Sequence, residues 1–82
     1  MIPMTLDTLP LATRAEITAI DWDVLAPEEA KRLRALGIDR GTRIHVAHRG
    51  ILAGRDPLAI VIGRTTVALR RSHARAMQVT PL

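Results

Sequence analysis

The sequence has 82 residues, no cysteine, a single aromatic residue, Trp22, and a formal net charge of +4. A chain of this length supports one small hydrophobic core. Without cysteine it has no disulfide and no thiolate that could act as a nucleophile or bind a soft metal. No apolar run approaches the roughly 20 residues of a membrane helix, and Met1–Asp7 lacks the features of a signal peptide. We therefore expect a soluble, cytosolic protein with one domain over residues 1–82 and an aliphatic core.

The first half of the chain predicts one strand and one helix. Thr5–Leu11 is an extended lead-in that ends around a proline. Glu16–Asp21 is short and rich in β-branched residues, which favours a strand. Pro27 suits the first turn of a helix, and the two glutamates after it lie where the helix dipole favours acids. Gly37 is suited to end that helix, so we predict a helix over Pro27–Leu36.

The second half of the chain predicts four short strands separated by turns. These strands are Arg43–Arg49, Leu58–Ile62, Thr65–Leu69 and Met77–Thr80. Gly63 and Arg64 form a tight hairpin between the second and third of them. The segment Gly50–Pro57 carries two glycines and is predicted to be a loop. Ser72 is predicted to cap a single helical turn before the last strand.

These elements predict a mainly β fold. Five short antiparallel strands with tight connections bury their edges most completely by curling into a small barrel. One short helix lies between the first two strands, and a helical turn precedes the last.

Three blocks of residues, in order and with matching spacing, carry a resemblance to a known family. The blocks are Leu9-Pro10 with Ala15-Glu16-Ile17 and Ile20; Arg32–Ile38 with Gly41-Thr42, Ile44 and Val46; and Asp56–Ile60 with Gly63, Ala68–Arg71, Ala74, Ala76 and Val79. The chain resembles the FeoA family, which comprises small cytosolic partners of the FeoB ferrous-iron transporter. This resemblance implies an SH3-like barrel that works without a cofactor, through protein contact with the cytosolic part of FeoB.

The sequence also departs from the family pattern. Ala12 stands where the family usually has glycine, and Arg40 stands where it often has proline. The segment around Gly50–Arg55 is longer than usual, and Ser72-His73 replaces a common acidic residue.

The three histidines are candidate metal ligands, because iron transport suggests a metal site. His45 and His48 are three residues apart on a predicted strand, so we expect their side chains to leave opposite faces of the sheet. Only His73 could join one of them, and no cysteine or paired carboxylate is present at ligand spacing. We therefore predict no metal site within the chain. A metal shared between two chains at an exposed histidine stays an alternative.

The candidate docking surface combines an apolar pair with positive charge. Its residues are Ile51, Leu52, Arg55, Arg64, Arg70 and Arg71. The apolar pair either folds back over the core or docks a partner. The arginines are either a solvated edge or a patch for an acidic partner. Nucleic acid is not expected, since Trp22 is the only aromatic side chain available for stacking.

Other function classes have less support in the sequence. No catalytic constellation is recognisable, so an enzyme is not expected. The runner-up is a regulatory SH3-like domain linked to an iron-dependent transcriptional repressor, since such repressors carry a similar domain beside their helix-turn-helix. Contact with the membrane is expected only through the partner, and weak self-association stays open.

Overall fold

The computed structural model describes residues 4–50 and 56–82. Its strands are β1 (Met4–Thr5), β2 (Ala15–Ile20), β3 (Arg43–Arg49), β4 (Leu58–Ile62), β5 (Thr65–Leu69) and β6 (Met77–Pro81). Its α-helices are α1 (Pro27–Ala35) and α2 (Arg71–Ala74), and two short 3₁₀ turns are η1 (Leu6–Thr8) and η2 (Trp22–Val24).

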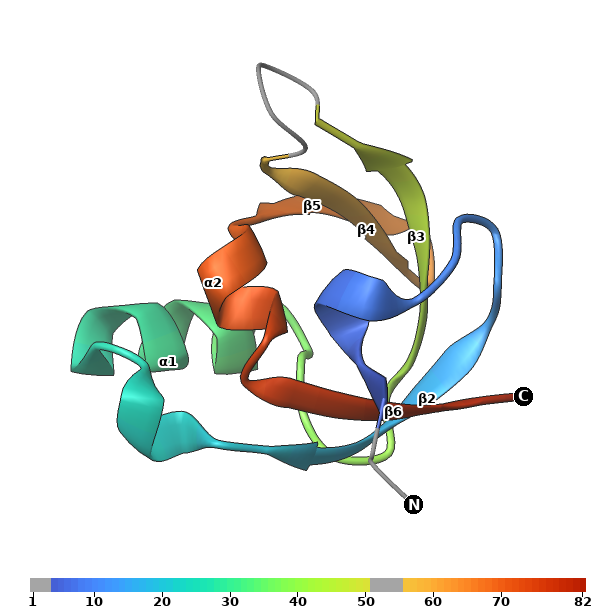
Figure 1. Ribbon diagram of the computed structural model, residues 1–82. Helices are drawn as coiled ribbons and strands as arrows, with labels where there is room; N and C mark the ends of the chain where they lie inside the picture. Colours follow the sequence, from blue (N-terminus) through green and yellow to red (C-terminus); the bar gives the residue numbers. More distant parts are fainter. Residues whose placement is uncertain (1–3, 51–55) are drawn as a thin grey trace.

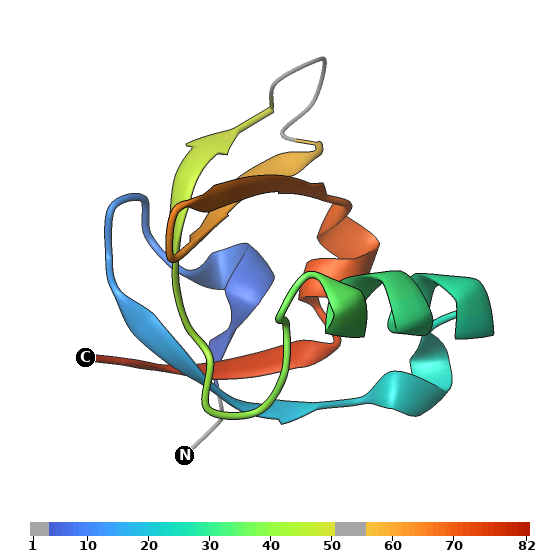
Figure 2. The ribbon, with the colours of Figure 1, turned by 180° about the vertical axis from the view of Figure 1, so that it is seen from behind.

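The strands form one antiparallel sheet in the order β1-β6-β2-β3-β4-β5. Figures 1 and 2 show this sheet curling round on itself, with α1 and α2 together on one side of it. The mainly β fold is confirmed. Six strands are present where five were predicted, because the short strand β1 at the start of the expected lead-in pairs with β6 through Met4 and Val79. Among the described residues the edge strands β1 and β5 do not pair, so the barrel is curled but not closed.

The core is aliphatic, as expected from the near absence of aromatic residues. The side chains that are almost fully buried come from every part of the described chain: Leu6, Leu9, Ile17, Leu33, Ile38, Val46, Leu58, Ile60, Leu69 and Met77. Trp22 is only partly buried and packs against the edge of this core, with the guanidinium of Arg34 over its ring at 4.2 Å from the ring centre. Burial of these aliphatic side chains is the main force that holds so small a sheet together.

Helix α1 ends as its sequence predicts. Gly37 has φ of 92° and its N–H donates to the carbonyl of Arg34, while the N–H of Ile38 donates to the carbonyl of Leu33. This pair of bonds is the Schellman arrangement, which lets a glycine close a helix and turns the next apolar residue back toward it. Ile38 and Leu33 are both buried as a result, and they anchor the helix on the sheet.

Helix α2 begins at Arg71, two residues earlier than a cap at Ser72 implies, so Ser72 is not its cap. Arg70 is the N-cap residue and makes no side-chain capping bond. Instead, the N–H of Arg71 donates to Oδ1 of Asp56 at 2.9 Å. The first turn of α2 is thus capped by the carboxylate of Asp56, which precedes β4, whereas α2 follows β5. Because the two residues are 15 positions apart in the chain, the sequence did not indicate this cap.

One turn contains backbone strain. Ala12 has φ of 60°, in the left-handed region that favours glycine. Its N–H donates to the carbonyl of Val46 at 3.0 Å, which holds the turn before β2 against β3. This backbone conformation is one that glycine adopts freely, and alanine costs about 1 kcal/mol at such a position.

Candidate protein-interaction surface

The outward face of β3 differs from the prediction because the strand contains a bulge. His45 pairs with Val61 and His48 pairs with Ala59, and the register shifts by one residue between Val46 and His48. Paired residues in an antiparallel ladder share a face, and Val61 and Ala59 are two apart on a regular strand. Both histidines therefore lie on the outward face. The expectation that they leave opposite faces is wrong, because the extra residue resets the alternation.

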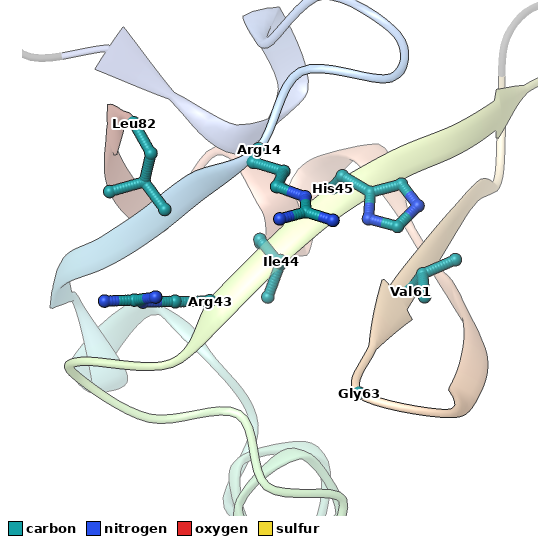
Figure 3. Close-up of a pocket in the computed structure, with 7 residues that line it drawn as sticks. All are labelled: Arg14, Arg43, Ile44, His45, Val61, Gly63 and Leu82. Atoms are coloured by element: carbon teal, nitrogen blue, oxygen red, sulfur yellow. The ribbon is translucent and has the colours of Figure 1, made fainter.

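The shared face does not by itself make a metal centre. Among residues 4–50 and 56–82, no three histidine or acidic side chains gather closely enough to hold a metal ion. His45 also lines one hollow together with Arg14 (Figure 3). A bound cation would meet the positive charge of that guanidinium, which works against metal binding there.

The side chain of His73 on α2 faces α1. Its Nδ1 lies 3.5 Å from Oε1 of Glu29 on α1, and that nitrogen is buried without a hydrogen-bond partner among the described residues. A hydrogen bond from Arg32 holds the pKa of Glu29 below its ordinary value, partly opposed by burial and reinforced by the charges of Arg32, His73 and Arg70. His73 of α2 therefore lies beside the Glu29 carboxylate of α1 without a hydrogen bond to it.

The predicted basic residues are divided between the two ends of β5. Arg64 lies in the hairpin turn before that strand, and Arg70 and Arg71 follow it. Six residue steps along an extended strand separate Arg64 from Arg70 by roughly 20 Å. The structure thus brings Arg70 and Arg71 together and leaves Arg64 apart. Arg75 is occupied differently, since its Nε lies 3.5 Å from Oδ2 of Asp7.

The corner around Arg70 and Arg71 is adjacent to the end of the long connection between β3 and β4. Asp56 caps α2 through the N–H of Arg71, and Leu58 pairs with Leu69 in the ladder. The predicted contact residues Ile51, Leu52 and Arg55 lie outside the described residues.

A small hollow on the outward face of β2, β3 and β4 was not predicted from the sequence. Figure 3 shows Arg14, Arg43 and His45 around it, and its volume is about 210 Å³. Small-molecule sites usually have about 300–1,000 Å³, so this hollow suits one or two side chains better than a cofactor. Its lining contains no carboxylate side chain, hydroxyl or thiol, and so offers no nucleophile with a neighbouring base.

A second hollow of about 470 Å³ lies between β2, β6 and α2. Its lining includes Asp21 and Arg75, which carry opposite charges, and the exposed side chain of Val24. This mixture gives no clear preference for the charge of a ligand. In the described part of the chain, no helix is long and apolar enough to cross a membrane.

Comparison with known proteins identifies the family. The chain matches the FeoA domain over residues 4–81. FeoA of Stenotrophomonas maltophilia, a prokaryotic SH3 domain protein solved in complex with zinc, is 37% identical with a TM-score of 0.76, and the match covers 94% of this chain and 89% of that one. The FeoA protein of Chlorobium tepidum is 29% identical with a TM-score of 0.81, over 96% of this chain and 70% of that one.

A likeness of fold extends to a different class of protein. A manganese-dependent transcriptional repressor is 24% identical with a TM-score of 0.80, and the match covers all of this chain (100%) but only 44% of the repressor. No curated protein sequence matches significantly. The SH3-like fold is confirmed by the S. maltophilia structure. With the FeoA domain spanning nearly all of its length, this chain belongs to the FeoA family.

Proposed function

We propose that this protein assists ferrous-iron uptake by binding the cytosolic part of a FeoB-like transporter. The observation that carries the proposal is the FeoA domain match over residues 4–81. The S. maltophilia relative, at 37% identity, is described as a candidate activating factor of bacterial ferrous-iron transport. The protein acts in the cytoplasm, has no cofactor of its own and reaches the membrane only through its partner.

A binding role also agrees with the chemistry of the surface. The hollow beside Arg14, Arg43 and His45 is lined by cationic and apolar side chains. Its lining has no pair of groups suited to acid–base catalysis. Arginines beside apolar side chains are a common composition for a docking surface.

The docking surface proposed from the sequence centres on the corner of Arg70 and Arg71. Arg70 is exposed and Arg71 is half-buried. The backbone N–H of Arg71 is fixed by Asp56, which places that corner on a defined part of the scaffold. Ile51, Leu52 and Arg55 complete the surface in the sequence-based proposal, with Leu52 as the apolar contact.

The proposal is tested by measuring binding to the purified cytosolic region of the FeoB-like transporter encoded in the same genome. We expect Arg70→Glu combined with Leu52→Asp to weaken binding about tenfold or more, since a reversed charge faces an acidic surface. Arg40→Glu is the matched control, because Arg40 is exposed in the turn between α1 and β3. Absence of binding by the unmodified protein contradicts the function. Equal binding by the folded double variant contradicts this placement only.

The second candidate function is a regulatory domain linked to a metal-dependent repressor. Its support is the TM-score of 0.80 to a manganese-dependent transcriptional repressor, of which this chain covers 44%. A salt-sensitive mobility shift with duplex DNA, together with no binding to the transporter region, would favour it.

A further inference from the structure

The outward face of β2 and β3 gathers three nitrogen-bearing side chains at one point. Ala15 pairs with Ile44 in the ladder, and both side chains are buried, at 0% and 3% exposure. Because side chains alternate along a strand, the residues on either side of this pair point outward. Those residues include Arg14, which directly precedes β2, and Arg43 and His45 on β3, and all three line the hollow in Figure 3.

The charges of this hollow are not used within the fold. Among the described residues, no ion pair involves Arg14 or Arg43. Glu16 lies opposite Arg43 in the ladder, but it does not line the hollow and forms no ion pair with Arg43 in the described part of the chain. Two guanidinium groups on one surface, with no acidic side chain in the lining, form a ready site for a carboxylate.

The rest of the hollow is apolar. Val61 of β4 and the exposed side chain of Leu82 line it, and Gly63 of the β4–β5 hairpin lies at its far end (Figure 3). A site with cationic groups beside an apolar wall favours a ligand that combines the two complementary properties. Its volume of about 210 Å³ limits that ligand to one or two side chains.

We infer that this hollow is a second contact site, which receives an acidic segment of the partner protein. In that contact, Arg14 and Arg43 bind carboxylates of the segment, and an apolar side chain beside them packs on Val61. The inference rests on the proposed function, since the partner is the cytosolic region of the transporter. It places this contact at the Gly63 end of the β4–β5 hairpin, and the corner of Arg70 and Arg71 lies at the other end of the same hairpin.

The charge and chemistry of the hollow favour an acidic protein segment over other occupants. A second copy of this chain would bring a net charge of +4 toward a positive site, which disfavours it. Nucleic acid is disfavoured because no aromatic side chain lines the hollow for stacking on bases. An acidic protein segment that also carries an apolar side chain complements both the positive charge and the apolar part of the hollow.

The test compares variants of the whole chain in binding the purified cytosolic region of the FeoB-like transporter. Arg14→Glu with Arg43→Glu should weaken binding at least about tenfold, and the neutral pair Arg14→Gln with Arg43→Gln should weaken it several-fold. A pair of Lys31→Glu and Arg40→Glu is the matched control for charge, since both residues are exposed and neither lines the hollow. We expect this control to weaken binding less than threefold at 0.15 M salt, where distant surface charges are largely screened (about 8 Å).

The outcomes separate this inference from the function on which it rests. If the unmodified protein does not bind the transporter region, the proposed function fails and the inference fails with it. If the unmodified protein binds, the Arg70→Glu corner variant binds weakly and the Arg14/Arg43 variant binds normally, only the inference is overturned. Equal loss in the Lys31/Arg40 control would also overturn it, because net charge alone would then explain the effect. Unchanged circular dichroism and thermal midpoint confirm that the variants are folded.

Discussion

The helical side of the molecule and the outward face of β2 and β3 use their charged residues in different ways. On the helical side, Arg32 is paired with Glu29 at 2.5 Å, and His73 contacts the same carboxylate. Arg34 lies over the ring of Trp22, and the carboxylate of Asp56 caps α2. On the outward face, Arg14 and Arg43 flank a hollow without an acidic side chain in its lining.

This comparison distinguishes arginines that stabilise the fold from arginines that are available to bind a partner. A guanidinium held by a neighbouring carboxylate is partly neutralised and fixed in position, so it attracts a partner weakly. An exposed guanidinium beside an apolar wall can gain a new carboxylate without losing an existing one. Net charge and the count of arginines in the sequence do not make this distinction, since it depends on which side chains meet in the fold.

The largest expected effect concerns the anchor that holds the helical side in place. Leu33 of α1 is fully buried, at 0% exposure. Replacement by alanine leaves a cavity and should cost about 2–5 kcal/mol of unfolding free energy. Leu11→Ala is the matched control, because Leu11 is 52% exposed and should cost less than about 0.5 kcal/mol. Chemical denaturation measures both, and similar losses would contradict the assignment of Leu33 to the core.

The second prediction removes the cap of α2. Asp56→Ala deletes the acceptor for the N–H of Arg71 and should lower the unfolding free energy by about 1 kcal/mol. Asp56→Asn keeps an oxygen acceptor and should restore most of this loss. Denaturant midpoints measure the difference. An alanine variant as stable as the asparagine variant would show that the carboxylate does not support the helix.

The third prediction concerns the arginines of the outward face and their effect on stability. Arg14→Gln with Arg43→Gln should change the unfolding free energy by no more than about 0.5 kcal/mol, because neither arginine forms an ion pair among the described residues. Thermal and urea unfolding provide the measurement. A loss above about 2 kcal/mol would mean that these arginines stabilise the fold, and the contrast between the two regions would disappear.

The smallest effect is a dependence on pH at Glu29. The hydrogen bond from Arg32 lowers the pKa of Glu29 below its ordinary value of 4.5, so the carboxylate stabilises the fold above that value. This contribution falls away as the pH drops through the lowered pKa, since the unfolded chain then binds more protons than the folded one. Glu29→Gln should therefore be less stable than the unmodified protein at neutral pH, and the gap should close in acid.

Urea midpoints at neutral and strongly acidic pH measure this gap. Because the pair is partly exposed, the difference at neutral pH should be small. A gap that widens in acid would have the wrong sign for a carboxylate stabilised by Arg32.

Local signals in the sequence were sufficient for most of the fold. The strand predicted over Arg43–Arg49 is present, and its alternating residues Ile44 and Val46 are both buried. Gly37 ends α1 and Gly63 turns the β4–β5 hairpin, each with positive φ. These features depend on residues a few positions apart, so their physical cause is visible in the sequence itself.

The features that the sequence did not predict all depend on contacts between distant segments. β1 has only two residues and exists because it pairs with β6. The bulge in β3 carries no glycine signal, and it decides which face holds His48. The cap of α2 comes from Asp56 across the hairpin. The hollow needs β2, β3 and β4 to be adjacent before Arg14 and Arg43 can meet.

The central claim is that Arg14 and Arg43, on the outward face of the sheet, bind the partner protein. Amide chemical-shift mapping tests it most directly. The isotope-labelled protein would be titrated with the purified cytosolic region of the FeoB-like transporter. We predict that the largest shifts occur at His45, Val61 and Gly63, which line the hollow, while the amides of Ala30 and Leu33 in α1 barely move. Shifts concentrated on α1, with the hollow unaffected, would contradict this account.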